Sequence, residues 1–178
     1  MKYLIMCEGP NELEVIRILL ENNKLIFSED DLLNLVPYHA RQIDKNAAVK
    51  AALNLYHGEE EVLRIGDKLG EKLKIPKEYK SQIKSVKKYC TKPELEMLLI
   101  ISEQLEAEFE KKKSKISPKS FSKENIVYNR IHYNNSTSFY REYFGERVDL
   151  LLHAMKRYKQ LKGKHQKDEG YLADLLKE

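Results

Sequence analysis

The hydrophobic pattern near the start of the chain predicts a strand, a tight turn and a helix in succession. Residues 3–7 (YLIMC) are five consecutive apolar residues without polar alternation, which is typical of a strand buried on both faces of a parallel sheet. The run stops at Glu8, and a Gly-Pro pair follows. Apolar residues then recur at helical spacing, and Asn11 with Glu14 three positions later fits the start of a helix. We therefore expect a helix that Asn11 caps.

Further along, the pattern predicts alternating strands and helices and then mainly helices. We expect strands over residues 33–43, 62–65 and 86–90, and helices over residues 45–55, 77–87, 91–113 and 146–162, with another helix at the end of the chain. This order is typical of an α/β fold with a small, mainly parallel sheet flanked by helices.

One segment is a candidate boundary within this order of elements. The basic, Pro/Ser-containing stretch KKKSKISPKSFSK is the connection that follows the expected helix at residues 91–113. We therefore divide the chain into an α/β core, residues 1–113, and a helical C-terminal extension, residues 114–178, packed on the same domain.

The composition is that of one ordinary domain with a charged surface. The 178 residues are 42% hydrophobic and 34% charged. Uninterrupted apolar runs reach five residues, far below the ~20 that a bilayer-spanning helix needs. The first run also ends too soon, at Glu8, for a signal peptide. The two cysteines give no disulfide framework or zinc motif, so we expect a cytoplasmic protein that does not bind membranes.

The charges are distributed unevenly along the chain. Residues 1–70 contain 8 Lys/Arg and 12 Asp/Glu, whereas the rest contains 24 Lys/Arg and 16 Asp/Glu. An acidic pocket that holds cations beside a basic surface that binds a polyanion would give this asymmetry. Lysines that only keep exposed helices soluble would give it as well.

Two carboxylates follow predicted strands, each beside a glycine. Glu8 comes after the first strand, and Asp67 comes after the strand at residues 62–65. In open α/β sheets ligands bind beyond the carboxyl ends of the strands, so neighbouring strands would turn both carboxylates toward one cleft. Gathered carboxylates repel, and a raised pKa or a hard cation such as Mg²⁺ relieves the repulsion. The alternatives are a loop carboxylate that accepts backbone N–H bonds and an ordinary Gly-Asp turn.

Three short motifs resemble those of one superfamily of nucleic-acid enzymes. IMCEGPNE (residues 5–12) and VLRIGD (residues 62–67) resemble the first two motifs of the Toprim superfamily, in which one strand ends in Glu-Gly and a later strand ends in Asp-x-Asp. TKPELEMLLI (residues 91–100) resembles the Pro-x-x-Glu helix start of the OLD-type and RloB-like Toprim proteins of bacterial defence systems. The resemblance covers residues 3–101.

This resemblance implies a Toprim/Rossmann-like fold and nuclease chemistry with Mg²⁺ or Mn²⁺. Glu8 would be the general base or a metal ligand, and Asp67 a metal ligand. Glu12 and Glu96 would complete the acidic site, although Glu12 also suits the first turn of a helix and Glu96 could face solvent. DNA or RNA would be the partner, and a homodimer or a larger defence complex would be the assembly. The side chains that we expect on the nucleic-acid strand are Lys113, Lys115 and Lys119.

One departure from the family pattern leaves two functions open. Where the family has its second aspartate, this chain has Leu69, and nearby Glu71 is a candidate replacement. Two-metal hydrolysis needs cations about 4 Å apart, each with acidic ligands. The chain is therefore either a metal-dependent nuclease or a catalytically inactive module of the same fold that binds nucleic acid or protein. Histidine-pair zinc motifs, a P-loop and a nucleophile elbow are absent from the sequence.

Overall fold

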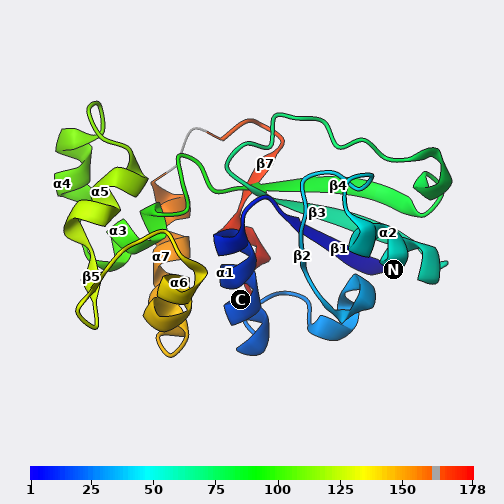
Figure 1. Ribbon diagram of the computed structural model, residues 1–178, viewed down its shortest axis with the longest axis horizontal. Coiled ribbons are helices and arrows are strands. Elements are labelled where there is room, and N and C mark those ends of the chain that lie inside the picture. The colour runs from blue at the N-terminus through cyan, green and yellow to red at the C-terminus, as the bar shows by residue number, and fades with distance from the viewer. Residues whose placement is uncertain (162–164) are drawn as a thin grey trace.

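A five-stranded parallel sheet forms the centre of the protein in the computed structural model, which describes residues 1–161 and 165–178 (Figure 1). Its pairings are all parallel. In spatial order the strands are β2 (Tyr38–His39), β1 (Lys2–Cys7), β3 (Glu60–Gly66), β4 (Ile83–Cys90) and β7 (Glu169–Tyr171). The expected α/β fold with a mainly parallel sheet flanked by helices is confirmed.

Helices lie on both faces of this sheet and beyond one of its ends. They are α1 (Pro10–Glu21), α2 (Ala47–Leu55), α3 (Met97–Ser102), α4 (Glu106–Lys112), α5 (Pro118–Asn125), α6 (Thr137–Phe144) and α7 (Val148–Gln160). Figure 1 shows α3 to α7 gathered to one side of the strands, with α1 between α6 and the sheet. A small hairpin joins β5 (Val127–Tyr128) to β6 (Ile131–His132). Among the described residues, no helix combines the length and the apolar character needed to cross a membrane.

The core consists of two apolar layers, one on each face of the sheet. Along β1, Leu4 and Met6 pack into the layer that contains α2, whereas Ile5 and Cys7 pack into the layer that contains α1. This alternation confirms that the first strand is buried on both faces. The layer around α1 also contains Phe121 of α5 and side chains of α6 and α7, so residues 114–178 share a core with residues 1–113.

The cap of the first helix lies two residues earlier than the predicted cap, Asn11. Gly9 is the N-cap and Pro10 occupies the first turn, where its fixed φ fits and its missing N–H costs nothing. Asn11 is therefore free of the capping role, and its side-chain amide donates to the Oδ1 of Asn135, 3.1 Å away. Glu14 does not cap the helix either, because its carboxylate accepts a hydrogen bond from Arg141 of α6.

For the middle of the chain, the strand predicted within residues 33–43 is confirmed only as a short one, and the helix predicted over residues 77–87 is wrong. Residues 33–43 form a short 3-10 turn, with Asn34 at φ 55°, and then only the two-residue strand β2. Residues 77–87 form a 3-10 turn at Lys77–Tyr79 followed by β4 rather than a helix. Several side chains of β4 are exposed, and its lysines form ion pairs such as Lys87 with Glu61 at 2.9 Å. The strand predicted over residues 86–90 is therefore confirmed as the second part of β4, and this polar surface hid only its first residues.

The later helix predictions hold only in part. The helix expected over residues 91–113 is two helices, α3 and α4, separated by Gln104 at φ 59°. The helix expected at residues 146–162 is confirmed as α7, and residue 162, its expected end, lies outside the described residues. The helix expected at the end of the chain is wrong, because Glu169–Tyr171 is a strand of the sheet and Leu172–Leu175 is a 3-10 turn.

Candidate functional site

The carboxyl ends of β1 and β3 meet at one edge of the sheet. Cys7 pairs with Ile65, and the backbone N–H of Glu8 donates to the carbonyl of Ile65 at 2.8 Å. Asp67 follows β3 by one residue. The two strands are therefore neighbours, and the two carboxylates are placed at the same edge, as the sequence predicts.

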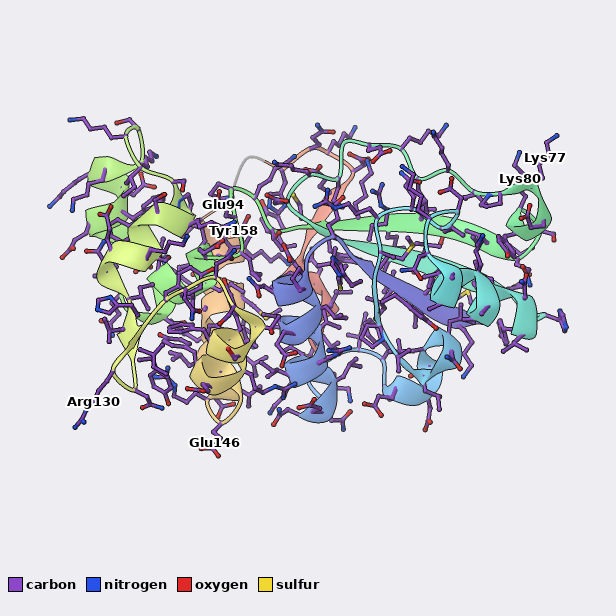
Figure 2. All side chains as sticks on the ribbon, in the orientation of Figure 1. Lys77, Lys80, Glu94, Arg130, Glu146 and Tyr158 are labelled. Carbon is purple, nitrogen blue, oxygen red and sulfur yellow. The ribbon has the colours of Figure 1, made fainter. Side chains whose placement is uncertain are left out.

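A cavity of about 290 Å³ opens at this edge, and its walls contain the four acidic residues predicted for the site, Glu8, Glu12, Asp67 and Glu96. We call it the carboxylate pocket. Its acidic residues are Glu8, Glu12, Asp67, Glu94 and Glu96, and its cationic residues are Arg41, Lys68 and Lys119. Figure 2 places Glu94 where the sheet meets the C-terminal helices. The pocket is therefore built by both parts of the chain.

Glu8 is held from two sides at the bottom of the pocket. It is 7% exposed, its Oε1 lies 3.5 Å from the Nη2 of Arg64, and its Oε2 accepts a hydrogen bond from the backbone N–H of Lys68 at 3.1 Å. Burial raises the pKa of Glu8, while the Lys68 N–H and the Arg64 guanidinium act in the opposite direction. A side chain at Gly66 would place a Cβ 2.6 Å from the Cγ of Glu8. Any residue larger than glycine at position 66 would therefore collide with the Glu8 side chain.

Glu12 lies in the first turn of α1, and its carboxylate rests against Gly9. Burial, with further contributions from Asp67, Glu96 and Glu8, raises its pKa to about 7. These carboxylates therefore interact with one another across the pocket, and the carboxyl group of Glu12 can exchange a proton close to neutral pH.

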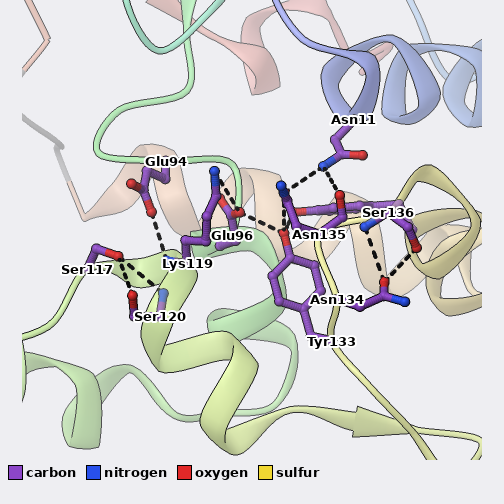
Figure 3. Close-up of polar contacts among 11 residues, drawn as sticks. Asn11, Glu94, Glu96, Ser117, Lys119, Ser120, Tyr133, Asn134, Asn135 and Ser136 are labelled. Atoms are coloured by element: carbon purple, nitrogen blue, oxygen red, sulfur yellow. Dashed lines mark hydrogen bonds and ion pairs between the residues drawn. The ribbon is translucent and has the colours of Figure 1, made fainter.

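Glu96 is fixed by a tyrosine from the C-terminal part of the chain (Figure 3). It is 4% exposed, and its Oε1 accepts a hydrogen bond from the hydroxyl of Tyr133 at 2.6 Å. The Tyr133 hydroxyl also lies 3.1 Å from the Oδ1 of Asn135. Burial raises the pKa of Glu96, which the Tyr133 hydrogen bond partly offsets. Glu96 thus does not face solvent.

Glu94 and Lys119 form the wall beside Glu96. The Glu94 carboxylate accepts the backbone N–H of Lys119 at 2.7 Å, and the Nζ of Lys119 lies 4.0 Å from the Oε1 of Glu96. Sequence reasoning missed Glu94, Tyr133 and Asn135 as site residues. A capping-box pattern was the only local signal at Glu94, and no local pattern marks the other two.

The Tyr133–Glu96 hydrogen bond gives a stability prediction. Tyr133→Phe leaves a buried carboxylate without its charge-assisted partner, so we expect the free energy of unfolding to fall by ~1–3 kcal/mol. Urea denaturation at neutral pH measures this change. The control is Tyr128→Phe, since Tyr128 is only partly buried and packs edge-on against Tyr143. Equal effects of the two substitutions would show that the hydrogen bond contributes little.

The other two predicted lysines lie away from the carboxylates. Lys113 and Lys115 line a separate cavity of about 940 Å³ between α4, α7 and the loop before α5, and Lys113 pairs with Glu110 at 2.6 Å. Lys77 and Lys80 project into solvent at the end of the sheet far from Glu94 (Figure 2). Of the lysines expected on a nucleic-acid strand, the structure therefore brings only Lys119 to the pocket.

Position 69, where the Toprim resemblance would expect a second aspartate, is part of the interior. Leu69 is fully buried, so this position does not present a side chain to the pocket. Glu71, the candidate replacement, is exposed and does not line the pocket. Its backbone carbonyl instead accepts a hydrogen bond from the Nη1 of Arg64 at 2.6 Å.

The donor chemistry of the pocket fits a hard divalent cation. Among residues 1–161 and 165–178, no group of three Asp, Glu, His or Cys side chains is arranged to hold a metal ion. The pocket does contain carboxylates and the Oδ1 of Asn11, a buried oxygen without a hydrogen-bond partner. Mg²⁺ prefers oxygen ligands and is commonly held by one or two carboxylates, waters and a substrate phosphate. Such a site needs fewer protein ligands than a closed cage.

Comparisons of the chain with protein-family models, with curated proteins and with solved structures found no match. What the protein does is therefore inferred from its own residues and their arrangement.

Proposed function

We propose that the protein is a Toprim-type nuclease that processes nucleic-acid phosphodiesters with Mg²⁺ or Mn²⁺. The observation that carries this proposal is the carboxylate pocket, in which Glu8, Glu12, Asp67 and Glu96 meet at the carboxyl ends of parallel strands. Lys119 at the same pocket provides a positive charge for a phosphate. Three motifs that resemble Toprim proteins contribute these four acidic residues, which supports the same assignment.

In this proposal each side chain has a distinct task. The cation, when bound, would polarise the phosphodiester and neutralise developing charge. Asp67, partly exposed at the rim, would anchor it, and Glu96 would complete its shell. Glu8, fixed by its partners, would position or activate the attacking oxygen. Glu12, with a pKa of about 7, would accept or return a proton near neutral pH.

The test is a cleavage assay of the full chain on single- and double-stranded DNA and on RNA, with Mg²⁺ or Mn²⁺. We expect metal-dependent cleavage that Glu8→Gln and Asp67→Asn each lower by about 100-fold or more, the scale of a lost general base or ligand. Glu71→Gln is the matched control, because Glu71 is exposed and outside the pocket. Cleavage that survives both pocket substitutions would contradict the proposal.

A second function is favoured by one observation, the full burial of Leu69 at the position of the family's second aspartate. A chain that has lost this ligand would retain the fold as a catalytically inactive nucleic-acid-binding or protein-interaction module. The same substrates distinguish the two functions. Salt-dependent binding of DNA or RNA that survives Glu8→Ala, without cleavage under any metal condition, would favour the binding module.

A further inference from the structure

We propose that Arg64 is a fixed internal cation of the carboxylate pocket and takes the place of a second metal ion, so that the pocket holds one divalent cation. This inference rests on the proposed function. It concerns how many ions the pocket takes and which residue supplies the remaining positive charge.

Arg64 is a buried charge that faces the pocket from inside the protein. It lies on β3 between Met6 of β1 and Lys88 of β4, and it is 1% exposed. A buried guanidinium is costly unless it is paired and hydrogen-bonded. Its Nη2 lies 3.5 Å from the Oε1 of Glu8. The ion pair with Glu8 therefore helps to hold the Arg64 guanidinium in place.

The same guanidinium also holds the turn that carries Asp67. Its Nη1 donates to the carbonyl of Glu71, so one side chain connects Glu8 to the segment after β3. Lys68 in that segment donates its backbone N–H to the other oxygen of Glu8. Both oxygens of Glu8 thus have a protein partner, and each retains capacity for one further bond, so the carboxylate can still contact an ion.

The charge balance of the pocket also favours one divalent cation. Five carboxylates face the three cations Arg41, Lys68 and Lys119, and Arg64 beneath the pocket adds a fourth positive charge. With all carboxyls ionised, the net charge is −1. One divalent cation changes it to +1, which matches one phosphodiester anion, whereas two would give +3 without a carboxylate at position 69 to anchor the second.

Calorimetric titration of the full chain with Mn²⁺ alone tests the number of ions directly. We expect one Mn²⁺ per chain. Two ions per chain would overturn this inference and leave the proposed nuclease standing. The absence of binding would instead overturn the metal-dependent function itself, and with it the inference that depends on it.

Substitution of Arg64 tests its role as a charge rather than as packing. Arg64→Gln removes a repulsive charge next to the ion, so we expect about tenfold tighter Mn²⁺ binding. Arg64→Lys retains the charge and should stay within threefold of the unaltered chain. The control is Arg17→Gln, an exposed arginine of α1 that pairs with Glu14.

Circular dichroism shows whether the Arg64→Gln protein is folded. If it is folded and binds Mn²⁺ more weakly than the unaltered chain, the inference is overturned, because weaker binding is what an arginine with a purely structural role predicts. If Arg64→Gln does not fold, the number of Mn²⁺ ions bound by the unaltered chain still tests the proposal, because two ions per chain would overturn it.

Discussion

Gly66→Ala is expected to lower Mn²⁺ affinity more than tenfold by displacing Glu8 from the carboxylate pocket. A Cβ at this position would lie 2.6 Å from the Cγ and 2.8 Å from the Cβ of Glu8. These atoms are next to the backbone, so a rotation of the carboxylate alone does not relieve the clash, and the end of β1 must shift. Overpacking of this kind costs about 1–3 kcal/mol. Titration with Mn²⁺ and urea denaturation measure the two effects.

The control for this substitution is another glycine a few residues away. No atom lies within 4 Å of the Cβ position at Gly70, and neither glycine has a positive φ. Gly70→Ala should therefore leave Mn²⁺ affinity unchanged and alter stability by less than about 0.5 kcal/mol. If the two substitutions behave alike, Glu8 is not held against Gly66 in the way described above.

Glu60→Gln is expected to stabilise the protein by about 2 kcal/mol at pH 8 and to have little effect near pH 4.5. Glu60 opens β3, is fully buried, and neither carboxyl oxygen has a hydrogen-bond partner. Burial raises its pKa to about 7. The folded state therefore keeps the proton that the unfolded chain releases at lower pH. Stability is greatest below the unfolded pKa and falls as the pH rises through 7.

Urea denaturation between pH 4.5 and pH 8 measures this dependence. Glu12 and Glu96 also have raised pKa values, so the difference between Glu60→Gln and the unaltered chain isolates Glu60. Glu59→Gln is the control, because the Glu59 side chain is 64% exposed. The stability difference between this variant and the unaltered chain should not change with pH. A stabilisation by Glu60→Gln that is the same at all pH values would exclude titration of Glu60 as the cause.

The parts of the fold that the sequence predicts are those with a local cause. Residues 3–7 are an uninterrupted apolar run and residues 62–65 are apolar except for Arg64, a pattern that favours strands covered on both faces. Since these strands are parallel neighbours, their carboxyl ends lie at the same edge of the sheet, and the residues that follow them, Glu8 and Asp67, come close together. This much of the site follows from short segments.

The parts that the sequence does not predict depend on contacts between distant segments. The first residues of β4 resemble part of a polar helix, so only residues 86–90 of this strand are predicted, and β7 is a strand because β4 offers an edge for it. At the site, Tyr133 meets Glu96 from 37 positions away, and Asn135 meets Asn11 from 124 positions away. Hydrophobic periodicity contains no information on such pairs, since each segment looks ordinary by itself.

The position of β7 has a consequence for how the chain assembles. During synthesis β1, β3 and β4 emerge long before Glu169–Tyr171, and until then the outer edge of β4 has unpaired backbone N–H and C=O groups. The backbone N–H of Lys177 then bonds to the carbonyl of Lys24, so the same segment also closes on the loop after α1. A fragment cut after residue 113 is therefore expected to aggregate through its open edge, although it contains most of the strands.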